Sequence, residues 1–62
     1  MNNLKRKRIE KGLTRKELSI CSGISERTIE SYEQGRRNIR SARMDTLVRL
    51  LKVLNCEIKE IL

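Results

Sequence analysis

The chain has 62 residues and a mass of 7.3 kDa, which is enough for one small domain. Apolar residues make up 37% of the sequence, with Tyr32 as the one aromatic residue, so they suit a small aliphatic core and exclude a large substrate cavity. The net charge of +7 indicates a polyanionic partner, and the absence of His excludes imidazole catalysis and His-containing metal sites.

The first half of the chain is divided into short helical segments by glycine. The sequence has no Pro, and Gly12, Gly23 and Gly35 each follow a helical pattern. A first helix is predicted at about 3–11, with Leu4, Arg8 and Ile9 on one face. A second is predicted at about 14–21, because residues 14–17 read Thr-Arg-Lys-Glu, the spacing of a capping box.

Three more helices are predicted in the rest of the chain. Ser25 is a suitable N-cap for a helix at about 25–34, whose Ile29 and Tyr32 are expected to face the core. A basic loop separates it from a strongly amphipathic helix at about 42–54, with apolar residues at positions 44, 47, 50, 51 and 54. A short fifth helix is predicted at about 57–62. The whole chain, 1–62, is therefore predicted to be a single all-α domain of five short helices.

The positive charge is concentrated in two blocks. Residues 1–16 have a net charge of +6 and residues 34–43 a net charge of +4, whereas residues 17–33 between them have −3 and residues 44–62 are neutral. If the two basic blocks meet in space, they form two surfaces suited to phosphates on either side of a differently charged element.

Residues 15–34 have the pattern of a helix-turn-helix. Two helices of about eight residues are joined by a turn that contains Gly23, with the small Ser19 where the helices cross and aliphatic residues to close the crossing. The chain resembles small Cro-like or Xre-like repressors of the lambda-repressor-like family over essentially its whole length. The resemblance is carried by KRIEKGLT at 7–14, ELS at 17–19, SGISERTI at 22–29, YEQGRRN at 32–38 and TLVRLLKVL at 46–54.

The resemblance implies that the third helix reads DNA. The residues at the matching positions would face the bases: Ser25, Glu26, Arg27, Thr28 and Ser31. Arg27 is the best candidate for direct readout, since a guanidinium can bond guanine O6 and N7 together, and Glu26 could accept from a cytosine amine. Glu30, in contrast, is expected to be solvated.

Phosphate contacts and one internal ion pair are also implied by the resemblance. The expected phosphate-contacting residues at matching positions are Thr14, Arg15, Gln34, Arg36 and Arg37. Arg40 is a further candidate from its charge, in a loop that is about three residues longer than is common in the family. Arg15 stands where relatives usually have Gln, so a charge replaces an amide there. Arg8 and Glu33 match a pair that forms a salt bridge between the first and third helices in relatives.

The leading interpretation is a sequence-specific regulator that binds double-stranded DNA and represses transcription by occluding an operator. A homodimer on two half-sites would supply affinity that one small module lacks, with Ile58, Ile61 and Leu62 either forming the dimer contact or packing on the core. The alternatives are a protein-binding antitoxin or antirepressor, and the DNA-reading part of a longer regulator. An enzyme is not expected.

The sequence also predicts the surroundings of the protein. It contains no signal peptide, transmembrane span or lipidation motif, and Cys21 and Cys56 lack the spacing of a redox or metal motif. We therefore expect a cytoplasmic, nucleoid-associated protein with free thiols. No membrane, metal, cofactor or small-molecule ligand is expected.

Overall fold

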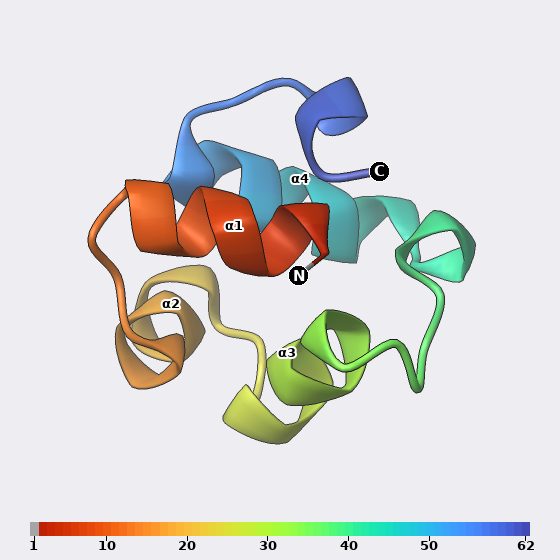
Figure 1. Ribbon diagram of the computed structural model, residues 1–62, viewed down its shortest axis with the longest axis horizontal. Helices are drawn as coiled ribbons and strands as arrows, with labels where there is room; N and C mark the ends of the chain where they lie inside the picture. Colours follow the sequence, from red (N-terminus) through yellow and green to blue (C-terminus); the bar gives the residue numbers. More distant parts are fainter. Residues whose placement is uncertain (1) are drawn as a thin grey trace.

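Residues 2–62, the part of the chain that the computed structural model describes, contain four α-helices and two 3-10 turns joined by loops (Figure 1). In chain order they are α1 (Asn3–Glu10), α2 (Arg15–Ser22), α3 (Glu26–Glu33), η1 (Ile39–Ser41), α4 (Met44–Leu54) and η2 (Ile58–Glu60). No strand occurs in these residues, so the predicted all-α class is confirmed.

The helices enclose one small aliphatic core. α2 packs against both α3 and α4, while α1 packs against α3 and η2. In Figure 1, α2 and α3 lie beside each other below α1. The buried apolar side chains come from every α-helix, from the turn between α2 and α3, and from the end of the chain: Leu4, Leu18, Ile24, Ile29, Tyr32, Leu47, Leu50, Leu54 and Ile61.

Side-chain caps fix where the first three helices begin. Thr14 Oγ1 accepts from the N–H of Glu17 at 3.0 Å, and Glu17 Oε1 accepts from the N–H of Thr14 at 2.9 Å, which confirms the predicted capping box. Ser25 Oγ accepts from the N–H of Thr28, as expected for the N-cap of α3. Asn2 caps α1 in the same way, by accepting from the N–H of Lys5, and the sequence reading missed this cap.

The prediction of a fifth α-helix is wrong, because residues 58–60 form only a single 3-10 turn, η2. α4 ends at Asn55, which takes a left-handed conformation with φ of 50°. After the 3-10 turn, Ile61 is 2% exposed and completes the core. The few remaining residues therefore turn back to bury Ile61 and do not extend into a regular helix.

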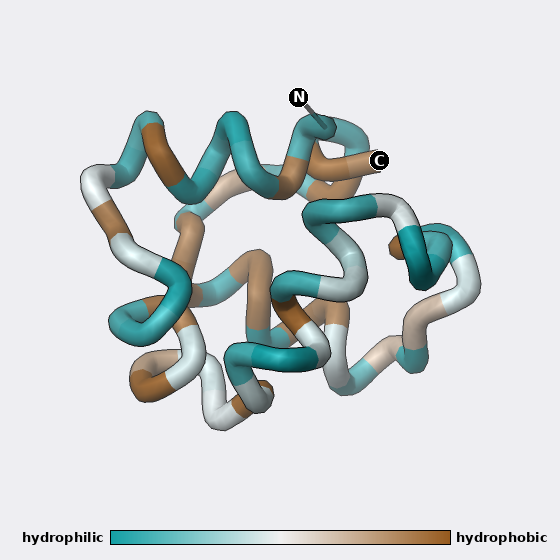
Figure 2. The backbone as a smooth tube through the Cα atoms, turned by 60° about the horizontal axis from the view of Figure 1, so that its bottom comes forward, coloured by the Kyte–Doolittle hydropathy of each residue, from teal (hydrophilic) through white to brown (hydrophobic). Residues whose placement is uncertain are grey.

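The start of the fourth helix and two core assignments also differ from the prediction. Residues 39–41 form their own 3-10 turn, capped by the Asn38 side chain, so α4 begins at Met44 and not near residue 42. Met44 is 70% exposed, since it lies in the first turn of α4, before the face formed by Leu47, Leu50 and Leu54 meets the core. Ile9 is 49% exposed, because Leu4 and Arg8 occupy the buried face of α1. The other residues of α1 are polar or charged, so most of this helix is hydrophilic (Figure 2).

Candidate nucleic-acid interface

A tight turn between α2 and α3 sets the angle at which the two helices cross. Gly23 caps the C-terminal end of α2, and its φ of 73° is a left-handed conformation that is unfavourable for residues with a Cβ atom. Ser22 is buried next to it, and its Oγ accepts from the N–H of Ile24. Leu18, Ile24 and Ile29 then close the crossing from inside. This arrangement is a helix-turn-helix, and it leaves the start of α3 at the surface.

The residues predicted to read bases lie on the outward side of α3 and at its cap. Ser25, Glu26 and Arg27 are exposed, and Thr28 and Ser31 are half-buried. Their hydroxyls already have local partners, because Ser25 Oγ donates to Thr28 Oγ1 at 2.9 Å and Ser31 Oγ donates to the carbonyl of Arg27 at 2.9 Å. Within residues 2–62, the side chains of Glu26 and Arg27 make no hydrogen bond or ion pair. They are the two long polar side chains of α3 that have no protein partner among the described residues.

The predicted phosphate contacts are spread over the two helix starts and the loop after α3. Thr14 caps α2, and Arg15 is its first residue. Gln34 ends α3, Arg36 and Arg37 follow it directly, and Arg40 lies in η1. All of these residues are exposed except Arg15, which is half-buried.

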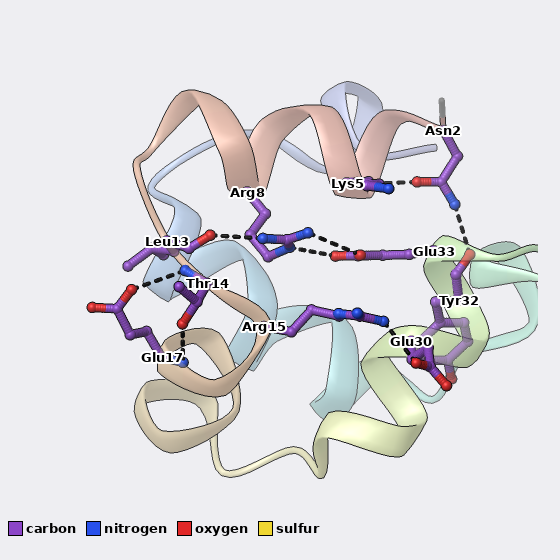
Figure 3. Close-up of polar contacts among 10 residues, drawn as sticks. All are labelled: Asn2, Lys5, Arg8, Leu13, Thr14, Arg15, Glu17, Glu30, Tyr32 and Glu33. Carbon is purple, nitrogen blue, oxygen red and sulfur yellow. Dashed lines mark hydrogen bonds and ion pairs between the residues drawn. The ribbon is translucent and has the colours of Figure 1, made fainter.

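Glu30 joins two of these arginines, which the sequence reading did not foresee. Arg15 Nη1 lies 2.8 Å from Glu30 Oε2, and Arg36 Nη2 lies 3.0 Å from Glu30 Oε1 (Figure 3 shows the first contact). Glu30 was expected to be solvated; its side chain is 37% exposed, but both of its carboxylate oxygens are paired with arginines. Its partners are 15 and 6 residues away in the sequence, too far for the local i to i+4 spacing of helical ion pairs to reveal them.

A third ion pair lies on the inner side of α3. Arg8 Nε donates to Glu33 Oε2 at 2.6 Å, Arg8 Nη2 donates to Glu33 Oε1 at 3.2 Å, and Arg8 Nη1 donates to the carbonyl of Leu13 at 2.7 Å (Figure 3). The two side chains are 10% and 3% exposed, so both charges are shielded from water. Nearby, Asn2 Nδ2 donates to the carbonyl of Tyr32 at 2.6 Å. Together these contacts tie α3 to α1 at the end opposite its cap.

The titrating groups whose pKa is shifted lie elsewhere, where α1 meets η2. Hydrogen bonds to Glu10 and Glu60 raise the pKa of Lys7. The backbone N–H of Glu57, together with Lys7, holds the pKa of Glu60 below its ordinary value. Burial, with the nearby charge of Glu60, raises the pKa of the Cys56 thiol, so this cysteine is less reactive than a thiol of ordinary pKa. Among residues 2–62 no group of three or more acidic or sulfur ligands is placed to hold a metal ion.

The comparison with protein families agrees with a helix-turn-helix. A family model described as the Cro/C1-type HTH DNA-binding domain matches residues 3–62. The chain belongs to this family. Neither the curated proteins nor the solved structures gave a match. Membership in the Cro/C1-type family supports a DNA-binding regulator as the function. Within the described residues, no helix of this family member combines the length and apolar character that a membrane crossing requires.

Proposed function

We propose that the chain is a sequence-specific transcriptional repressor that places α3 in the major groove of duplex DNA and occludes an operator. The observation that carries this proposal is the outward face of α3, where Glu26 and Arg27 are unpaired within the described residues, next to a cluster of basic side chains. Mixed charge on the reading helix favours discrimination between bases, whereas the surrounding arginines favour attraction to any duplex.

In this proposal the start of α3 reads the bases. Arg27 bonds guanine O6 and N7 together, which is worth about 1–3 kcal/mol of discrimination against another base. Glu26 accepts from a cytosine amine, and the short side chains of Ser25, Thr28 and Ser31 contact base edges or thymine methyl groups. The local hydrogen bonds of the three hydroxyls support this role, because they fix each oxygen in one orientation before DNA arrives.

The surrounding side chains contact the phosphates and hold α3 in register. The capping hydroxyl of Thr14 already accepts from a backbone N–H, so its own hydrogen is available to donate to a phosphate. The remaining contacts come from Arg15, Gln34, Arg36, Arg37 and Arg40. Phosphate contacts do not depend on the DNA sequence. Each contact that a mutation removes should lower the salt dependence of DNA binding.

We further propose that the protein binds DNA as a homodimer. A single module of this size offers an interface of about 600–1,000 Å², which gives weak binding, and two copies on half-sites one helical turn apart would restore affinity. Of the three apolar residues considered for the contact, Ile61 is buried in the core, while Ile58 is 37% exposed and Leu62 is half-buried. The surface open to a partner copy therefore centres on Ile58 and Leu62.

Binding to two duplexes across a salt series tests the proposal. One duplex has random sequence, and the other is the promoter upstream of the protein's own gene. A specific repressor should prefer the promoter by about 10³ or more, and both affinities should fall steeply with salt. R27A should lose the preference and keep the salt slope, whereas R37Q should weaken binding to both duplexes and reduce the slope by about 1. Absence of binding to either duplex at low salt would favour the protein-binding antitoxin or antirepressor.

A further inference from the structure

Glu30 connects two separate parts of the basic surface through one carboxylate. It lies in the middle of α3, and its two oxygens accept from Arg15 at the start of α2 and from Arg36 in the loop after α3, at 2.8 and 3.0 Å. We propose that Glu30 is a positioning residue for DNA binding, which holds Arg15 and Arg36 at a fixed separation that matches phosphates beside the groove. This inference rests on the proposed function, because it takes both arginines to contact phosphates.

The backbone of Arg36 is fixed independently of its side chain. The N–H groups of Gly35 and Arg36 bond the carbonyls of Tyr32 and Ser31 at 3.2 and 2.9 Å, and Gly35 has a φ of 79°. This is the Schellman arrangement that ends many helices. Arg36 is thus anchored to α3 at its main chain, and the bond to Glu30 anchors the far end of the same side chain.

Each arginine keeps most of its hydrogen-bonding capacity for a second anion. A guanidinium has five N–H donors, and Glu30 accepts one donor from each arginine. The Arg15 and Arg36 side chains are 39% and 58% exposed, so the remaining donors can be reached from solvent. A phosphate can therefore bind either guanidinium while the carboxylate stays in place.

The charges explain why an acid is useful at this position. Glu30 with its two arginines carries a net charge of +1, so the cluster as a whole still attracts a phosphate. Long arginine side chains lose conformational freedom when they bind, and that cost is smaller when a partner has already ordered them. Because phosphate contacts set the register of the helix in the groove, fixing both arginines should improve discrimination between sequences more than overall affinity.

The test compares E30Q with E10Q, which makes the same charge change at a different place. Glu10 is 53% exposed at the end of α1 and pairs with Lys7, on the side of α1 that faces η2. Both variants are measured against random duplex DNA and against a duplex that the wild-type protein selects from a random library. We expect E30Q to bind random DNA at least as tightly as E10Q, and to bind the selected duplex about three- to tenfold more weakly than E10Q.

A second comparison shows whether the effect passes through the arginines. In an R15Q/R36Q background, adding E30Q should change the affinity for the selected duplex no more than adding E10Q does, within about twofold. A purely structural role would lower binding to both duplexes in proportion to the folded fraction, which circular dichroism measures, and would leave their ratio unchanged.

Two results would overturn the inference. If E30Q and E10Q are equal on the selected duplex, Glu30 does not position the arginines. If E30Q binds that duplex more tightly than E10Q, the carboxylate holds the arginines away from DNA. A different result would count against the proposed function itself: R15Q/R36Q binding the selected duplex with wild-type affinity and salt slope would show that these arginines contact no phosphate, whatever Glu30 does.

Discussion

The buried pair between Arg8 and Glu33 should be a point at which losing one partner harms the fold more than losing both. R8A leaves the Glu33 carboxylate, 3% exposed, without its cation and also frees the carbonyl of Leu13. E33A leaves the Arg8 guanidinium, 10% exposed, with a single acceptor. Breaking a buried pair in this way costs about 3–5 kcal/mol, because the remaining charge stays out of water without compensation.

The double variant R8A/E33A removes both charges, so its loss of stability should be smaller than that of either single variant. Domains of this length have a total stability of about 3–9 kcal/mol, so either single substitution removes a large share of it. Urea unfolding followed by circular dichroism measures the difference: with a slope near 1 kcal/mol per molar urea, the single variants should lose about 3 M or more from their midpoint. All proteins are compared in the same sucrose-containing buffer, which keeps the weakest variant folded at zero urea.

The reasoning would be refuted if the double variant were as unstable as either single variant, or less stable than it. Such a result would mean that the packing of the two side chains, and not the pairing of their charges, holds α3 in place and stabilises the fold. The thermodynamic cycle separates the two contributions, since only a charge pair gives a coupling that the second substitution relieves.

Two further predictions concern the turn between α2 and α3 and the ion pairing of Glu60 in η2. G23A should lower the free energy of unfolding by about 1–2 kcal/mol in thermal melts, because Ala disfavours a φ of 73°. The added Cβ would contact only the Arg49 side chain, at an ordinary 3.6 Å. DNA binding should fall more in G23A than in the control G12A, since Gly12 lies outside the helix-turn-helix. A melting temperature that G23A leaves unchanged would contradict this. Glu60 has a lowered pKa, so the stability it contributes is present above its ordinary pKa of 4.5 and is lost as the pH falls through the value in the folded protein. The drop in melting temperature between pH 7 and pH 3 should therefore be smaller in E60Q than in the wild type, and an equal drop would show that Glu60 does not stabilise the fold.

Features that depend on neighbours in the sequence could be predicted, and features that depend on the end of the chain or on distant partners could not. The capping box at Thr14 and the cap at Ser25 use side chains within three residues, and Gly23 marks a turn by its own conformational freedom. The extent of the last helix was mispredicted because burial of Ile61 decides it, and this burial depends on the whole fold.

The candidate site shows the same division between local and distant information. The positions of Glu26 and Arg27 on the outward side of α3 follow from the helical period once Ile29 and Tyr32 are placed in the core. The role of Glu30 was missed, since an exposed glutamate on a helix has no local signal for partners that approach from α2 and from the following loop.

The pairing of acids on α3 explains how a negatively charged helix can face a polyanion. By sequence, α3 has a net charge of −2, with Arg27 against three glutamates. Glu33 is neutralised from inside by Arg8, and Glu30 is neutralised by Arg15 and Arg36. Glu26 is thus the one glutamate of α3 whose charge is uncompensated by an ion pair among the described residues. Three arginines of the two basic blocks therefore neutralise acids of α3. Under the proposed function, this pairing removes charges that would repel DNA and leaves one acid and one arginine at the start of α3 to distinguish base pairs.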